Sequence, residues 1–159
     1  MRILVVSDTH GRDGNLERAV LREQPFDMLI HCGDVEGREF FIEALAECPC
    51  TIVSGNNDFF SDLPREDELS IAGHRILISH GHYYGVSMDF SRIVDEAHSR
   101  NCDCVCFGHI HRPVLEEIDG VLVLNPGSLS FPRQRNRKPS YAVLDINENG
   151  HISAEIQYL

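Results

Sequence analysis

This sequence of 159 residues lacks the features that would place it in a membrane or outside the cell. No apolar run approaches the roughly 20 residues that a membrane-spanning helix needs. Met1 and Arg2 are followed directly by a short apolar segment at 3–6, without the long apolar core of a secretory signal peptide. These absences predict a protein that is not held in a membrane and that is located in the cytoplasm.

The six cysteines lack the spacing of a disulfide framework or of a thiolate zinc site. Cys102, Cys104 and Cys106 alternate along one predicted strand, where neighbouring thiols cannot easily form a bridge. Cys48 and Cys50 are separated by one residue, and no CxxC pair is present. We therefore expect reduced thiols that are buried as small hydrophobic side chains.

Positive charge is also scarce. The chain has 14 Lys and Arg against 25 Asp and Glu, a formal net charge of −11. This balance disfavours tight, sequence-independent binding to nucleic acid, which requires Lys and Arg along one face. An anionic substrate would need a local reversal of charge, which bound divalent cations could supply.

The first half of the chain alternates between strand and helix patterns. Apolar runs predict strands at 3–6, 28–30 and 51–53, and apolar residues at helical spacing predict helices at 14–23 and 40–46. This order is typical of parallel strands with helices packed on the sheet.

The second half contains more strand patterns than one small sheet can hold. Strands are predicted at 69–71, 75–78, 104–107, 114–118, 121–124, 141–146 and 152–158, with a helix at about 89–99. The 147–150 segment, Asn-Glu-Asn-Gly, is a strong turn signal. We expect two packed sheets with helices outside, in one domain that spans residues 1–159 without an internal repeat or linker.

Side chains that can bind metals follow the ends of five predicted strands. The clusters are Asp8-Thr9-His10-Gly11, Gly33-Asp34, Gly55-Asn56-Asn57-Asp58, His80-Gly81-His82 and Gly108-His109-Ile110-His111. Each cluster alone is weak evidence, because turns commonly contain these residues. Ligands in open α/β sheets bind beyond the carboxyl ends of strands, so five clusters in this order predict one shared site. Imidazole, carboxylate and amide oxygen suit divalent transition metals.

The motif order D-x-H, G-D, G-N-x-D, H-G-H and G-H-x-H resembles the calcineurin-like metallophosphoesterase superfamily. Within it, the chain is similar to the small YfcE-type phosphodiesterase group. The resemblance extends from Asp8 to the turn at Asn125-Pro126-Gly127-Ser128. It implies an α/β (α+β) fold, a four-layer αββα sandwich of two mixed β-sheets flanked by helices.

The resemblance also implies two divalent metal ions. Asp8, His10, Asp34 and His111 would hold one ion, and Asp34, Asn56, His80 and His109 would hold the other, with Asp34 bridging. Mn²⁺ or Ni²⁺ are the expected activators, and Zn²⁺, Fe²⁺ or Mg²⁺ are further candidates. The implied activity is hydrolysis of small phosphodiesters by a hydroxide that bridges the metals. No protein nucleophile is needed, so Ser128 is interpreted as a turn residue.

One position departs from the family pattern. Many members have His after the metal-binding Asn, where it can protonate the leaving group, and this chain has Asn57. An amide can hydrogen-bond a substrate but cannot act as an acid near neutral pH. We keep Asn57 as a catalytic and substrate-binding candidate. We also hypothesise that His82 assists the leaving group; the alternative is a histidine that supports the ligands or lies on the surface.

The only basic run comprises Arg133, Arg135, Arg137 and Lys138. It is either a solvated loop or a lip that guides an anionic substrate to the metals, and Arg133 is the candidate substrate contact. Loops 59–68 and 131–139 would shape the pocket around the metals and so determine which substrate fits.

Several readings compete with the phosphodiesterase. They are a catalytically weak metal-binding scaffold or protein-interaction module on the same fold, a phosphomonoesterase, and a nuclease, which the acidic charge disfavours. A homodimer is also possible, since dimers are common.

Overall fold

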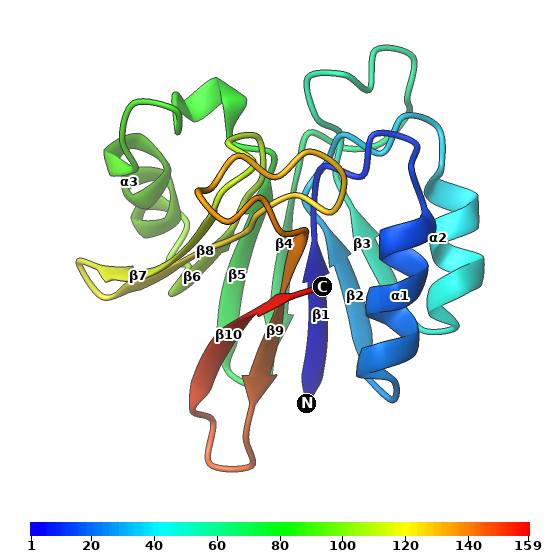
Figure 1. The fold of residues 1–159 in the computed structure, drawn as a ribbon. Helices are drawn as coiled ribbons and strands as arrows, with labels where there is room; N and C mark the ends of the chain where they lie inside the picture. The colour runs from blue at the N-terminus through cyan, green and yellow to red at the C-terminus, as the bar shows by residue number, and fades with distance from the viewer.

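The computed structural model describes residues 1–159, which form four layers (Figure 1). Two five-stranded mixed sheets pack face to face. Helices α1 (Gly14–Glu23) and α2 (Glu39–Ala46) cover the outer face of the first sheet, and α3 (Ser91–Ser99) covers the outer face of the second. The αββα sandwich that the resemblance implied is confirmed.

The first sheet has the strand order β10-β9-β1-β2-β3. Its strands are β1 (Arg2–Val6), β2 (Met28–His31), β3 (Cys50–Ile52), β9 (Ser140–Ile146) and β10 (Ile152–Tyr158). Strands β1, β2 and β3 are parallel, with Ile3 opposite Met28. On the other side of β1, β9 pairs antiparallel with β1, and β10 pairs antiparallel with β9. The three parallel strands therefore end at one edge of the sheet.

The second sheet has the order β4-β5-β6-β8-β7. Its strands are β4 (Glu66–Ile71), β5 (His74–Ser79), β6 (Cys104–Cys106), β7 (Pro113–Ile118) and β8 (Val121–Pro126). Strands β5, β6 and β8 are parallel, and β4 and β7 are antiparallel hairpin partners at the edges. A short 3₁₀ helix, η1 (His82–Tyr84), follows β5.

Alternation along the strands divides the core into three apolar layers. Ile3 and Val5 face the second sheet, where they join Cys104 and Cys106 in the layer between the sheets. Leu4 and Val6 face the opposite way, toward α1 and α2. All six cysteines are free thiols.

The observed boundaries differ from the predicted ones mainly at β4 and α3. Strand β4 begins at Glu66, before the predicted 69–71, because its backbone pairs with β5 from Glu66 opposite Ser79. Its added residues are polar and partly exposed, so hydrophobic periodicity does not mark them. Helix α3 begins at Ser91. None of the helices has both the length and the hydropathy to cross a membrane.

Candidate metal centre

The loops that follow β1, β2, β3, β5 and β6 meet at one edge of the two sheets, at the top of Figure 1. Five of the seven predicted ligands in these loops have a left-handed backbone: Asp8 (φ 54°), His10 (φ 47°), Asp34 (φ 58°), His109 (φ 70°) and His111 (φ 56°). This conformation is uncommon for residues other than Gly and concentrates at functional sites, where packing must hold it. The clustering of left-handed residues at one edge indicates a built site.

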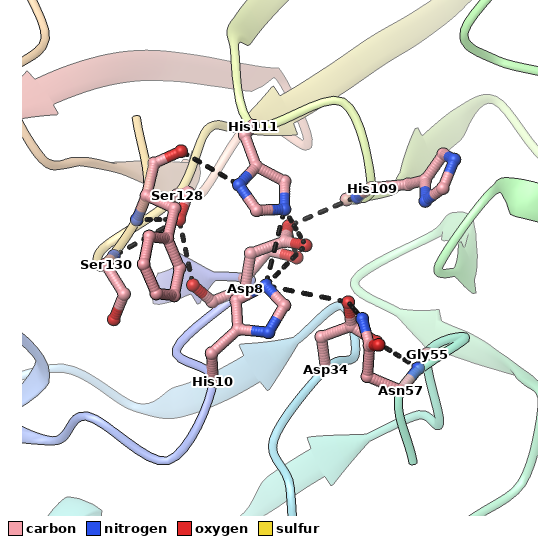
Figure 2. Close-up of polar contacts among 12 residues, drawn as sticks. Asp8, His10, Asp34, Gly55, Asn57, His109, His111, Ser128 and Ser130 are labelled. Carbon is pink, nitrogen blue, oxygen red and sulfur yellow. Dashed lines mark hydrogen bonds and ion pairs between the residues drawn. The ribbon is translucent and has the colours of Figure 1, made fainter. Parts of the chain in front are cut away.

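Four of the predicted ligands form a compact group: Asp8, His10, Asp34 and His111. Figure 2 shows their side chains pointing toward one another from the loops after β1, β2 and β6. His111 Nε2 lies 3.1 Å from Asp8 Oδ1 and 3.3 Å from His10 Nε2, and His10 Nε2 lies 3.6 Å from Asp34 Oδ2. Ligands about 2.0–2.2 Å from one ion lie roughly 3–3.5 Å from each other, so this group could hold a divalent metal.

The Asp8 carboxylate offers a direct test of that fit. Its Oδ2 accepts hydrogen bonds from Ser7 Oγ at 2.6 Å and from the His109 backbone N–H at 3.1 Å. Its Oδ1 is buried and has no hydrogen-bond partner. A buried carboxylate oxygen without a partner is costly unless a cation satisfies it, so Asp8 is arranged to place one oxygen on a metal.

The histidine rings are oriented by bonds on the side away from the group. His111 Nδ1 bonds the Phe131 carbonyl oxygen at 2.8 Å, and His80 Nδ1 bonds the Cys32 carbonyl oxygen at 2.7 Å. His10 Nδ1 bonds Glu36 Oε1 at 2.8 Å. When Nδ1 donates to these acceptors, Nε2 carries the lone pair that a metal needs. Three imidazoles are therefore presented in the ligating tautomer.

The remaining predicted ligands form a second group beside the first. Asn56 Oδ1 lies 3.1 Å from His80 Nε2 and 2.9 Å from His109 Nδ1. His80 Nε2 in turn lies 3.5 Å from Asp34 Oδ2, the oxygen that is 3.6 Å from His10 Nε2. Figure 2 shows the His109 ring to the side of the first group. Asp34 Oδ2 is thus at nearly equal distance from a histidine of each group.

The charges within the site are strongly coupled. Burial disfavours the Asp8 carboxylate, yet the imidazoles of His111 and His80 beside it outweigh burial and lower the pKa of Asp8. Burial disfavours charged His111 as well, but the nearby Asp8 carboxylate raises the pKa of His111. Burial and the nearby His80 lower the pKa of His109. The site has a negative pole at Asp8 that favours a cation.

Asp58 is the residue whose role the sequence reasoning missed. Its carboxylate accepts hydrogen bonds of 2.7 to 3.3 Å from four backbone N–H groups, those of Asp34, Val35, Glu36 and Gly55. It therefore ties the loop after β2 to the loop after β3. Its place in the G-N-x-D cluster was the available signal, but a ligand and a loop tie look alike in sequence.

Gly55 and Gly108 are required for close approach at the same edge. A Cβ at Gly55 would lie 2.1 Å from Asp34 Oδ1, and a Cβ at Gly108 would lie 2.0 Å from Ser7 Oγ. Real Cβ atoms do not approach other atoms this closely, so any side chain at either position would displace the ligand loops. The glycines beside the metal-capable residues are thus structural parts of the site.

A cavity of about 630 Å³ opens over the first group. Asn57 and Arg133 both line it. Arg137, a member of the basic run to which the sequence assigns no role, lines it as well. The Asn57 side-chain amide donates to Asp34 Oδ2 at 2.7 Å, and its backbone N–H donates to Asp34 Oδ1 at 2.8 Å. The two predicted substrate contacts therefore share one cavity with the ligands.

His82 lies outside that cavity. It lines a neighbouring hollow of about 480 Å³ together with Arg65, Tyr83 and Asn56. Its Nδ1 is buried without a hydrogen-bond partner, and burial and the charges of His80 and His109 lower its pKa. The side chain is thus close to the second group of ligands and faces a separate space.

Ser128 has the structural role expected of a turn residue. Its Oγ donates to the Asp8 carbonyl oxygen at 2.8 Å and accepts from the Phe131 N–H at 2.8 Å and the Ser130 N–H at 3.1 Å (Figure 2). The hydroxyl thereby joins the loop after β8 to the loop after β1. With its hydrogen and both lone pairs engaged, this serine is poorly placed to act as a nucleophile.

Comparison with known proteins agrees with this geometry. A family model described as the calcineurin-like phosphoesterase superfamily domain matches residues 1–149. The probable metallophosphoesterase YsnB of Bacillus subtilis is 36% identical over 152 residues, which cover 94% of this chain and 86% of the relative.

Two further relatives cover most of the chain. A phosphodiesterase of Methanocaldococcus jannaschii is 30% identical over 145 residues, covering 80% of this chain and 83% of the relative. A Streptococcus pneumoniae crystal structure, described as a predicted phosphoesterase, superposes with a TM-score of 0.81 at 26% identity and covers 99% of this chain and 97% of its own.

Proposed function

The chain belongs to the calcineurin-like phosphoesterase superfamily, and on that premise we propose that it is a metal-dependent phosphodiesterase that hydrolyses small phosphodiesters at a two-metal centre. The observation that carries the proposal is the position of Asp34 Oδ2 between two ligand groups, 3.6 Å from His10 Nε2 and 3.5 Å from His80 Nε2. A carboxylate shared by two groups in this way is the arrangement of two-metal hydrolases.

Each ligand group would hold one divalent ion. Asp8, His10, Asp34 and His111 would hold one ion, and Asp34, Asn56, His80 and His109 would hold the other. When bound, such a pair of ions supplies Lewis acidity and a water of lowered pKa. Mixed nitrogen and oxygen donors suit Mn²⁺ and Ni²⁺, although supply decides which metal is bound in the cell.

Two side chains of the cavity are assigned to the substrate. Arg133 is exposed at the cavity wall, where its guanidinium binds a phosphoryl oxygen. The Asn57 amide, which donates to Asp34 Oδ2 at 2.7 Å, lines the same cavity and would donate to a substrate oxygen. Both groups hold the phosphodiester in position without transferring a proton.

His82 is assigned to the leaving-group side. Its hollow adjoins the second ligand group through Asn56, and the His82 side chain is partly exposed there. This position allows a proton donor to replace the histidine that Asn57 does not supply.

The test is hydrolysis of a chromogenic diester and its matching monoester by metal-stripped protein to which Mn²⁺, Ni²⁺, Mg²⁺ or Zn²⁺ is restored separately. We expect the diester to be cleaved faster than the monoester, and we expect this cleavage to be lost in Asp34→Asn. Asp95→Asn, the same change at an exposed position of α3, should retain it. If no metal restores cleavage of either ester, the proposal is wrong.

A protein-interaction module is the second candidate. Phe59 is 78% exposed and Phe60 is fully exposed, in the loop that follows the third ligand cluster. Adjacent exposed phenylalanines can mark a contact with another protein. This reading gains if the metal-restored protein is inactive and replacing both phenylalanines by Ser abolishes a complex that the wild-type chain forms.

A further inference from the structure

The loop between β8 and β9 has a charge opposite to that of the whole chain. Residues 127–139 contain Arg133, Arg135, Arg137 and Lys138 and no acidic residue, while the chain carries −11. Figure 1 shows this loop, in yellow and orange, crossing the edge where the ligand loops meet. This loop therefore adds positive charge beside the predicted metal centre.

Five arginines that line hollows at this edge lack acidic partners, as do Arg65 and Arg92, whereas several other arginines are paired. Arg2, Arg38, Arg75 and Arg100 each pair with a carboxylate. Arg12, Arg18, Arg112, Arg133 and Arg137 make no ion pair, and all five are exposed. Unpaired guanidinium groups are available to bind anions from solution.

These unpaired arginines line three adjoining hollows. The central cavity shares Arg133 with a hollow of about 330 Å³ that also contains Arg112. It shares Ser130 with a hollow of about 430 Å³ that contains Arg12 and Arg18. The cavity over the predicted metal ligands thus adjoins two arginine-lined hollows.

An aromatic ring stands where two of the hollows meet. Phe131 lines the central cavity and is 41% exposed. The Arg12 guanidinium lies 4.4 Å from the centre of its ring. Cationic grooves interleaved with exposed aromatic side chains are typical of surfaces that bind single-stranded nucleic acid, because the cations follow the phosphates and the rings stack on bases.

We propose that the substrate is a short single-stranded oligonucleotide, an inference that rests on the proposed phosphodiesterase function. The scissile phosphodiester occupies the central cavity, one neighbouring phosphate meets Arg112 and Arg133, and the other meets Arg12 and Arg18. In hydrolysis the oxygen of water bonds to phosphorus, one ester P–O bond breaks, and the leaving oxygen takes up a proton. A terminal phosphomonoester and a free hydroxyl are released.

The basic edge allows a short strand to bind even though the net charge of the chain disfavours nucleic acid. A charge of −11 opposes a long polyanion, which would extend over acidic surface. A strand of a few nucleotides contacts only the basic edge. The chain therefore selects short strands, and long single strands and duplexes bind less tightly per phosphate.

Fluorescence anisotropy of a labelled tetranucleotide tests the arginines without relying on turnover. Each phosphate contact to a single strand adds about 0.7 to the slope of log affinity against log salt. Two phosphates held by arginines predict that affinity falls roughly sevenfold between about 50 and 200 mM salt, and that Arg12→Gln/Arg18→Gln, which frees one of them, reduces this fall to about 2.6-fold. Arg92→Gln, at an exposed arginine of α3 without an ion pair, should behave as wild type.

Measuring turnover tests the proposal independently of the binding measurement. For the metal-restored enzyme, we expect kcat/KM for the tetranucleotide to exceed that for a chromogenic diester, and the ratio to fall in Arg12→Gln/Arg18→Gln. If the chromogenic diester is cleaved but tetranucleotide binding is insensitive to salt and to the double substitution, the oligonucleotide proposal is overturned and the phosphodiesterase stands. Failure to cleave any ester with any metal overturns both.

Discussion

At the scale of single residues, the site depends on which atom of each side chain is left free. Asp8 engages Oδ2 in two hydrogen bonds and leaves Oδ1 buried without a partner. His80 and His111 engage Nδ1 with backbone carbonyl oxygens and leave Nε2 toward the ligand groups. Sequence motifs name the ligands, but these supporting bonds decide which atom is offered to a metal.

His82 provides a prediction at this scale. We expect His82→Ala to slow cleavage of a diester with an alkyl leaving group by about 10²-fold, since general acid catalysis contributes about 10²–10⁴. A diester with a nitrophenol leaving group needs little protonation and should lose much less. The measurement is kcat for both esters in the wild type and the variant.

His151→Ala, at an exposed histidine remote from the ligand clusters in sequence, is the matched control. Equal losses for both leaving groups would show that His82 supports the ligands and does not donate a proton.

At the scale of elements, Asp58 joins two loops that the chain separates. Asp58→Ala leaves four backbone N–H groups without their acceptor. We expect the free energy of unfolding of the metal-free protein to fall by about 2–3 kcal/mol, because an unsatisfied buried donor costs about 1–3 kcal/mol and water reaches some of the four. Urea denaturation measures the change.

Asp62→Ala, at an exposed position of the same loop, should leave stability within about 0.5 kcal/mol of wild type. If the two variants are equally stable, Asp58 does not tie the loops.

A second prediction concerns His74, which joins the two sheets. Its Nδ1 bonds Asp103 Oδ2 at 2.6 Å, at the start of β6, and its Nε2 bonds the Gly150 carbonyl oxygen at 2.8 Å, in the β9–β10 turn. Both acceptors are oxygens, so both bonds form only in the imidazolium. Burial opposes this charge, but Asp103 and Gly150 outweigh it and raise the pKa of His74 above its ordinary value of 6.5.

The raised pKa of His74 determines how stability changes with pH. A raised folded-state pKa means that the stabilisation is complete below about pH 6.5 and is lost as pH rises through the folded-state pKa. We expect the wild type to exceed His74→Gln by up to about 1 kcal/mol in unfolding free energy at pH 5.5, and by less at pH 8.5. Asp103, the partner of His74, also accepts a hydrogen bond from the Arg75 backbone N–H. The Arg75 side chain does not compete with His74 for Asp103, because it pairs with Glu68.

Urea denaturation of metal-free protein at both pH values gives the two differences. Differences of the same size would contradict the charged pair.

At the scale of the whole molecule, the predicted ligands come from five loops of two sheets, so we expect metal binding to be coupled to folding. Metal that binds the folded chain should raise the free energy of unfolding by about 2.7 kcal/mol at a free concentration of 100 Kd. Thermal unfolding of metal-stripped protein with and without Mn²⁺ measures the effect. Asp34→Asn should gain much less, and Asp95→Asn should gain as much as wild type.

The fold was predictable where local patterns suffice. Apolar runs such as 3–6 and helical spacing at 14–23 mark buried strands and an amphipathic helix, because burial repeats at the period of each element. The start of β4 was not predictable, since Glu66 is ordered by backbone pairing with Ser79 on β5 and its own polar side chain carries no signal.

By itself, the sequence determined the order of elements, the residue types at each strand end and, through the order of its motifs, the resemblance to a phosphoesterase family. These properties depend on neighbours within a few residues. Tertiary structure alone decided that Asp34 stands between two histidine groups, that Asp58 ties two loops and that Arg12 and Arg133 flank one edge. Such relations arise when distant loops meet, and a net charge of −11 cannot reveal that unpaired cations gather at one edge.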